Sequence, residues 1–269
     1  MTSSKWLFPF LAFVLLACDM EAVREEADSH FQNGDFEAAV TGYSRVIKID
    51  TDDYFAVFNR AKANEALENY QEAYDDYNKL ALLRWNPFKS MLGRARCNFE
   101  LENYTAVIGD MNVLLTADED NMDALSLRGR AFVREGKNQE AIFDLSRVLR
   151  KDPNNVEALI SRGAAYARGG VGPKGIEDFD KALSIDPELP VAHFNKAMVF
   201  FVYEHYSASI RSFDDALQKN PEYGEAYTRR GMAKINDGKY PLKSACDDFG
   251  MGETYQDPLA ADYIKMYCK

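Results

Sequence analysis

MDALSLRGRAFVREGKNQEAIFDLSRVLRKDPNN, residues 122–155, contains the pattern on which the fold assignment rests. Small residues stand at its eighth and twentieth positions, Gly129 and Ala141. Leu145 follows at position 24 as a large apolar residue, and Pro153 lies near the end. Apolar residues recur at helical spacing on both sides of a polar central turn, so the segment predicts two antiparallel helices.

The pattern returns every 34 residues along the chain. Position 8 is small in all seven copies: Ala27, Ala61, Ala95, Gly129, Gly163, Ala197 and Gly231. Position 24 is large and apolar in the first six copies: Tyr43, Tyr77, Met111, Leu145, Phe179 and Phe213. Small residues let paired helices approach closely, and large ones fill the space between pairs. A fixed period of this length predicts a solenoid of stacked helical pairs.

This pattern resembles the tetratricopeptide repeat (TPR), over nearly all of the chain after residue 19. The resemblance implies an all-α fold, a right-handed α-solenoid of about seven helix–turn–helix repeats with a C-terminal capping helix. We assign the repeats to residues 20–53, 54–87, 88–121, 122–155, 156–189, 190–223 and 224–257. The last repeat has a two-residue insertion, Pro241-Leu242, in its turn. Residues 258–269 are expected to form the cap, with Asp257 as N-cap and Pro258 at the first helical position.

Residues 1–17 have the features of a targeting signal. Lys5 precedes an apolar run of 12 residues, WLFPFLAFVLLA at positions 6–17. A helix that spans a bilayer needs roughly 20. The run ends in Leu15-Leu16-Ala17-Cys18, which resembles the lipobox of bacterial lipoproteins. That resemblance implies lipid attachment at Cys18, a short tether at 18–19, and a membrane-anchored protein facing the periplasm or the cell surface. An ordinary cleaved signal beside a chance cysteine is the alternative.

Composition and motifs exclude several classes of function. The 46% apolar and 28% charged residues are ordinary for a folded soluble protein. The net charge of −11 argues against a nucleic-acid partner. The histidines, His30, His193 and His205, are scattered, and no GxSxG, HExxH or Rossmann glycine pattern occurs. We therefore expect no enzyme activity, no cofactor and no metal site. An envelope hydrolase, or an accessory subunit of one, is the alternative.

Charged residues also follow the repeat. Position 7 is a cation in six consecutive repeats: Arg60, Arg94, Arg128, Arg162, Lys196 and Arg230. Position 23 is an aspartate in four repeats: Asp76, Asp110, Asp144 and Asp178. The cations could form a basic binding ladder, or they could pair with acids between helices of successive repeats while their stems pack. Because residues of opposite charge recur at fixed positions of the repeat, the ion pairs are the favoured interpretation.

In TPR proteins the inner face is formed mainly by the first helix of each repeat. Carried onto this chain, repeats 3 to 5 supply a basic strip: Arg96, Arg130, Arg134 and Arg168. Repeat 6 supplies an apolar strip: Val191, Phe194, Met198, Phe201 and Val202. Together they predict a groove for an acidic extended peptide or amphipathic helix of an unknown envelope protein. Packing of repeat 6 against repeat 7 or the cap would instead hide the apolar side chains.

The remaining cysteines and the glycine-rich turn have structural interpretations. Cys246 and Cys268 come level if the last helices are antiparallel, which leaves a disulfide between them open in an oxidising compartment. Cys97 is expected to be a buried, unpaired residue. The turn GGVGPKG at 169–175 lacks the ending of a phosphate-binding loop, and we expect a loose turn there.

The last residues add to the resemblance. Ala245-Cys246-Asp247-Asp248-Phe249 and Tyr267-Cys268 resemble the C-terminal ends of TPR proteins from Bacteroidetes. The family resemblance implies a protein-binding scaffold, with envelope or secretion-machinery assembly as its setting.

Overall fold

A computed structural model describes residues 7–268, with side chains from Met20 onward. The first six residues of the proposed signal, and the side chain of Cys18, lie outside the described part of the chain. Every regular element between residues 7 and 268 is an α-helix. None of the helices described is long and apolar enough to cross a membrane.

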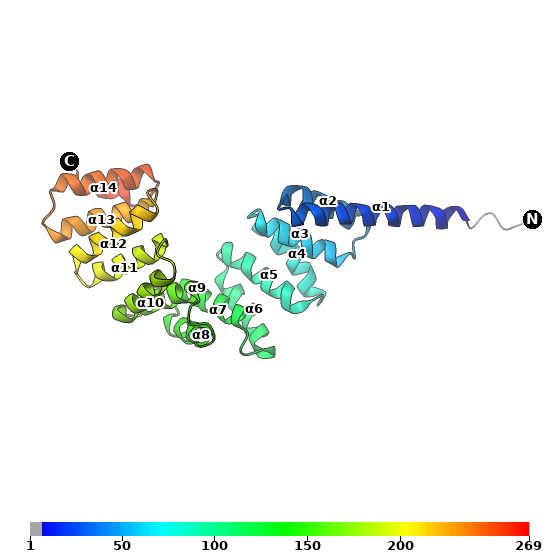
Figure 1. Ribbon diagram of the computed structural model, residues 1–269, viewed down its shortest axis with the longest axis horizontal. Helices are drawn as coiled ribbons and strands as arrows, with labels where there is room; N and C mark the ends of the chain where they lie inside the picture. The colour runs from blue at the N-terminus through cyan, green and yellow to red at the C-terminus, as the bar shows by residue number, and fades with distance from the viewer. Residues whose placement is uncertain (1–6, 269) are drawn as a thin grey trace, which may run out of the picture. The chain divides into compact units, whose positions relative to one another are not determined.

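The helices follow one another with short turns (Figure 1). In the N-terminal half they are α1 (Leu7–Gln32), α2 (Phe36–Ile49), α3 (Tyr54–Ala66), α4 (Tyr70–Leu82), α5 (Pro87–Glu100), α6 (Tyr104–Ala117) and α7 (Met122–Arg134). In the C-terminal half they are α8 (Asn138–Lys151), α9 (Val156–Arg168), α10 (Gly172–Ile185), α11 (Pro190–Val202), α12 (Tyr206–Lys219), α13 (Gly224–Asp237), α14 (Leu242–Thr254) and α15 (Ala260–Tyr267). The architecture is the all-α TPR solenoid that the repeat predicts.

The helices group into two compact units, and the division along the chain falls between Ala131 and Phe132 inside α7. Within each unit, helices adjacent in sequence pack against one another, as α3 does on α4 and α11 on α12. The 34-residue period continues through the boundary without an insertion. The repeat pattern therefore does not predict this division.

One residue with left-handed backbone conformation reverses the chain inside every repeat. It stands at position 15 and is glycine in four repeats: Gly34, Gly136, Gly170 and Gly238. It is glutamate in the other three: Glu68, Glu102 and Glu204, with φ near 60°. Such a residue ends a helix, and the N–H group of the next residue donates to a carbonyl in the last turn of that helix. In repeat 2, Asn69 N donates to Asn64 O at 2.9 Å. Glycine adopts this conformation without steric cost, whereas glutamate does not.

The core consists of the position-24 side chains packed against small residues at position 8. Phe179 and Phe213 are fully buried. A Cβ atom on Gly163 would lie 2.7 Å from the Phe179 ring, and one on Gly231 would lie 2.6 Å from the Phe249 ring. A larger side chain at position 8 would therefore collide with the ring of its own repeat, which explains why small residues recur there.

The glycine-rich turn at 169–175, expected to be loose, is bridged by a side chain of the next repeat. The Tyr203 hydroxyl donates to the Gly170 carbonyl and accepts from the Gly172 N–H, both at 3.2 Å. Gly172 is buried beside the Tyr203 ring and Val199. Tyr203 lies 33 residues away from Gly170, so the local sequence gives no sign of this support.

The C-terminal cap differs slightly from its prediction. The helix α15 begins at Ala260, two residues later than Pro258, and Leu259 rather than Asp257 is its N-cap. The chain leaves α14 through Gln256 in a left-handed conformation, and Asp257 N bonds back to Gly252 O at 2.9 Å. Asp257 and Pro258 therefore lie in the turn between α14 and α15 and not at the start of α15. A disulfide joins Cys246 and Cys268, whose Cα atoms lie 5.7 Å apart.

Candidate functional site

The position-7 cations are held by the repeats themselves. Four arginines make two hydrogen bonds each to one carboxylate of the second helix in the same repeat, at 2.6–3.1 Å: Arg60–Asp76, Arg94–Asp110, Arg162–Asp178 and Arg230–Asp248. The last pair is 18 residues apart instead of 16 because of the insertion in repeat 7. The ion-pair interpretation is confirmed, with the correction that these carboxylates belong to the same repeat.

A further hydrogen bond from position 7 reaches the preceding repeat. The acceptor is the residue 16 positions earlier: Ser44 for Arg60, Asn78 for Arg94, Asn112 for Arg128, Ser146 for Arg162, Asp180 for Lys196 and Asp214 for Arg230. The hydrogen bonds to Asp76 and Asp178 raise the pKa of Arg60 and Arg162, which keeps both permanently charged. These cations therefore link repeats and are not a ligand-binding ladder.

The predicted groove residues of the N-terminal unit are Arg96 and Arg130. The Arg96 Nε donates to Glu65 Oε1 at 2.6 Å, and the Arg130 guanidinium lies over the Phe99 ring at 4.4 Å. Both line a shallow pocket of about 250 Å³ that also contains Glu65 and Glu100. The two acids offset much of the positive charge expected on this strip.

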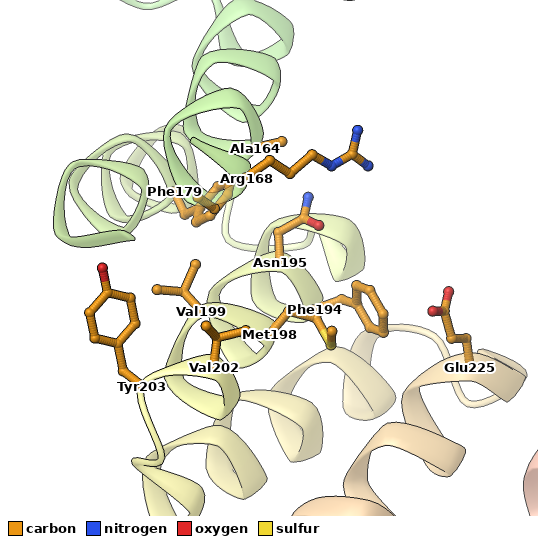
Figure 2. Close-up of a pocket in the computed structure, with 11 residues that line it drawn as sticks. Ala164, Arg168, Phe179, Phe194, Asn195, Met198, Val199, Val202, Tyr203 and Glu225 are labelled. Carbon is orange, nitrogen blue, oxygen red and sulfur yellow. The ribbon is translucent and has the colours of Figure 1, made fainter. Parts of the chain in front are cut away.

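In the C-terminal unit, four predicted groove residues meet in one pocket of about 360 Å³ (Figure 2). They are Arg168, Phe194, Met198 and Val202. The full lining is Ala164, Ala167, Arg168, Phe179, Phe194, Asn195, Met198, Val199, Val202, Tyr203 and Glu225. Arg134 and Phe201 are not part of it, and Phe201 packs on Tyr206 with ring centroids 5.6 Å apart.

The pocket has apolar walls and a polar rim. Its walls come from small residues of α9, from Phe179 on α10 and from the α11 face that carries Val199 and Val202 (Figure 2). Val202 is 71% exposed and is the most accessible apolar side chain there. On the rim, Arg168 Nη1 donates to the Val133 carbonyl at 2.8 Å, which uses one of the five N–H donors of a guanidinium. Glu225, on α13, accepts from Arg229 at 3.3 Å.

Phe194 is a core residue and not an exposed groove residue. It is 7% exposed, stacks on Tyr223 at 4.9 Å and meets Phe213 edge-on at 5.6 Å. For this residue the alternative prediction holds, because repeat 6 packs against the residues that lead into repeat 7. The exposed part of the predicted apolar strip is Val202, with Val191 at 40%.

Sequence reasoning missed several residues of the pocket. Ala164 and Glu225 stand at positions 9 and 2, which belong to the inner face but are neither basic nor large and apolar. Asn195 and Tyr203 stand at positions 6 and 14, which supply none of the predicted groove residues. An inventory of every inner-face position, whatever its residue type, would have found the first two.

Metal-ligating groups and the free thiol of Cys97 are the remaining described side chains that could carry chemistry. Among the side chains from residue 20 to 268, no group of three His, Cys, Asp or Glu residues is placed to hold a metal ion. Burial raises the pKa of the Cys97 thiol to about 12, so the nucleophilic thiolate does not form at neutral pH.

Comparisons with known families and structures agree with this geometry. A model described as tetratricopeptide repeat matches residues 24–88, and a model described as TPR repeat matches residues 129–170. Residues 24–88 and 129–170 are therefore tetratricopeptide repeat segments. No curated protein matches the sequence.

Solved TPR structures share the fold at low sequence identity. A TPR protein from Parabacteroides merdae ATCC 43184 has a TM-score of 0.76 and 17% identity, over 93% of this chain and 99% of that one. A thermophilic TPR protein from Thermus thermophilus has a TM-score of 0.56 and 15% identity, over 68% and 99%. YrrB, described as a TPR protein with an unusual peptide-binding site, has a TM-score of 0.54 and 19% identity, over 74% and 98%.

Proposed function

We propose that this TPR protein is a binding scaffold of the bacterial envelope, anchored by lipid at Cys18, that holds a peptide segment of a partner protein in the pocket lined by α9, α11 and α13. TPR folds commonly mediate protein–protein interaction, and YrrB is described as having a peptide-binding site. The observation that carries the proposal is the pocket itself. It combines the exposed Val202, apolar walls and the Arg168 cation on the inner face.

The lining specifies the chemistry of the peptide. A volume of about 360 Å³ with apolar walls accommodates a large apolar side chain. Arg168 favours a carboxylate beside that side chain, because a charge-assisted hydrogen bond to guanidinium is stronger than a neutral one. Asn195 can donate to and accept from a peptide backbone. We therefore propose an extended segment with one large apolar residue next to an acidic one.

Substitutions in the pocket should abolish partner capture. We expect Val202→Asp and Arg168→Glu each to reduce recovery of the partner from native envelopes at least about tenfold, as loss of a central contact does. The controls are Leu242→Asp, which replaces a 53% exposed residue of α14, and Arg211→Glu on α12. Circular dichroism should be unchanged in all four. Equal capture by the pocket and control variants would contradict the proposed site.

The anchor has its own test. We expect radiolabelled palmitate to enter the wild-type protein and to be lost from Cys18→Ala, because a thioether to the lipid needs the thiol. Cys97→Ala serves as the control and should keep the label. A mature N-terminus other than Cys18, or a wild-type protein without label, would reject the lipid anchor.

A further inference from the structure

Exposed apolar side chains gather at one edge of the N-terminal unit. Leu82 is 74% exposed, Leu83 is 51%, Phe55 is 67% and Ile49 is 49%. The Trp85 ring meets one of them, Phe55, edge-on at 5.1 Å. We call these five residues the apolar edge. Neighbouring apolar side chains with this exposure mark a contact surface.

Contacts within the unit place the apolar edge beside the part of α1 that contains Met20 and Arg24. Met20 packs against the cluster that contains Val46, near the end of α2. Arg24 pairs with Asp53 in the turn that follows α2. Lys79 Nζ donates to the Thr51 carbonyl of the same turn at 2.9 Å. The part of α1 around Met20 and Arg24, the turn at 50–53 and the end of α4 therefore share one edge.

The proposed lipid attachment site belongs to this edge as well. Cys18 is two residues before Met20, and α1 continues through both positions (Figure 1). Two residues of helix advance by about 3 Å. Acyl chains on Cys18 would therefore bring the bilayer to this edge of the N-terminal unit.

We propose that the apolar edge inserts into the interfacial region of the bilayer that holds the Cys18 acyl chains, so that the N-terminal repeats lie on the membrane. This inference rests on the proposed lipid anchor. Tryptophan favours the membrane–water interface because its ring is apolar with one polar group. Two cations are adjacent in sequence to these apolar residues: Lys48 precedes Ile49, and Arg84 precedes Trp85. Cations beside exposed apolar side chains are typical of segments that bind at a membrane interface.

The segment that carries Leu83 and Trp85 has a defined conformation. Trp85 N donates to the Leu80 carbonyl at 3.0 Å, and the Ser90 hydroxyl donates to the Trp85 carbonyl at 2.7 Å. Arg84 and Asn86 both adopt left-handed backbone conformations, with φ of 55° and 41°. A helix-ending turn of this kind holds Leu82 and Leu83 outward without an ordering cost on binding.

The distribution of charge favours a membrane over a protein partner. Within the N-terminal unit, the corresponding turn of the next repeat, Asp118-Glu119-Asp120, is acidic, so the exposed apolar side chains at the turns of this unit are those nearest the proposed anchor. In the turn at 50–53 the acids make contacts within the unit. Asp50 Oδ1 accepts from Asp52 N at 2.9 Å, and Asp53 pairs with Arg24. The Asp52 Oδ1 accepts from the Tyr54 hydroxyl at 3.4 Å, so each of these carboxylates has a partner within the N-terminal unit.

Trp85 supplies an intrinsic probe for the test. The sequence contains two tryptophans, Trp6 and Trp85, and processing at Cys18 removes Trp6. The mature lipidated protein is reconstituted into vesicles of phosphatidylethanolamine and phosphatidylglycerol with brominated acyl chains. We expect the bromines to quench Trp85 fluorescence. Leu82→Asp combined with Leu83→Asp should lose this quenching, whereas Val113→Asp, which alters a 58% exposed residue of α6, should retain it.

Each other outcome identifies what is wrong. Vesicle-bound protein whose Trp85 is not quenched would overturn the insertion of the apolar edge and leave the lipid anchor standing. Protein that keeps Trp6, or that does not stay with the vesicles, would overturn the anchor and this inference together. Shielding of Trp85 that requires a second envelope protein would show that the apolar edge is a protein-binding surface, which also overturns the inference.

Discussion

Replacing Phe213 by alanine is expected to lower the free energy of unfolding by about 3–5 kcal/mol. Phe213 is fully buried at position 24 of repeat 6, and its ring meets Phe194 at 5.6 Å. Its neighbours include Ala197 and Ala233, which have no side-chain freedom to fill the cavity. In a solenoid each repeat contacts only its neighbours, so the loss should concentrate in repeats 6 and 7. Urea unfolding followed by circular dichroism, with hydrogen exchange to locate the loss, measures both effects.

Phe143→Ala is the matched control for this substitution. Phe143 also stands on the second helix of a repeat, but it is 64% exposed. We expect a change within about 0.5 kcal/mol, as for surface sites in general. A similar loss from both variants would show that the position-24 side chains do not form the core described here.

Arg162→Met is expected to destabilise the protein by about 3–5 kcal/mol, because it leaves the buried Asp178 without its cation. Asp178 is only 6% exposed, and both of its oxygens accept from Arg162, at 2.7 and 2.8 Å. Adding Asp178→Leu should restore most of the lost stability, because the double variant no longer buries an unpaired charge. Urea unfolding of the double-mutant cycle measures the coupling.

Lys196 offers the comparison within the same series of position-7 cations. Its partner Asp180 is about half exposed, and position 23 of its repeat is Ser212, not an aspartate. Lys196→Met should therefore cost less than about 1 kcal/mol, as exposed ion pairs do. Equal costs for Arg162→Met and Lys196→Met would mean that burial of the carboxylate does not determine the strength of these links.

The repeat could be predicted from the sequence because its physical causes are local or periodic. Gly163 must be small because it faces Phe179 of the same repeat, and that relation recurs at a fixed spacing. The same periodicity identified positions 7 and 23 as ion-pairing positions, but it placed the partner of Arg162 in a neighbouring repeat and not at Asp178 of the same repeat. Position 15 was less predictable, since Glu68 adopts the left-handed conformation that glycine favours, and only the surrounding helices impose it.

Features that depend on contacts between repeats were missed. Phe194 was assigned to an open groove, but it stacks on Tyr223, the residue before repeat 7, and shares a buried cluster with Ala226 of repeat 7. Tyr203 orders the turn of the preceding repeat, which the glycines at 169–175 alone would leave loose. The predicted groove combined Arg96 with Phe194, yet they belong to different compact units and line different pockets. Such contacts depend on side-chain orientation, which a residue pattern does not contain.

The pocket of the C-terminal unit can be tested by photo-crosslinking from position 202. A photoreactive amino acid at position 202 occupies the site of Val202, 71% exposed at the pocket, and one at position 242 replaces Leu242, an exposed residue of α14. We expect irradiation of native envelopes to give one specific crosslinked partner from position 202 and not from position 242. Arg168→Glu should remove that product. The same product from both positions, or its persistence with Arg168→Glu, would contradict binding in the pocket lined by α9, α11 and α13.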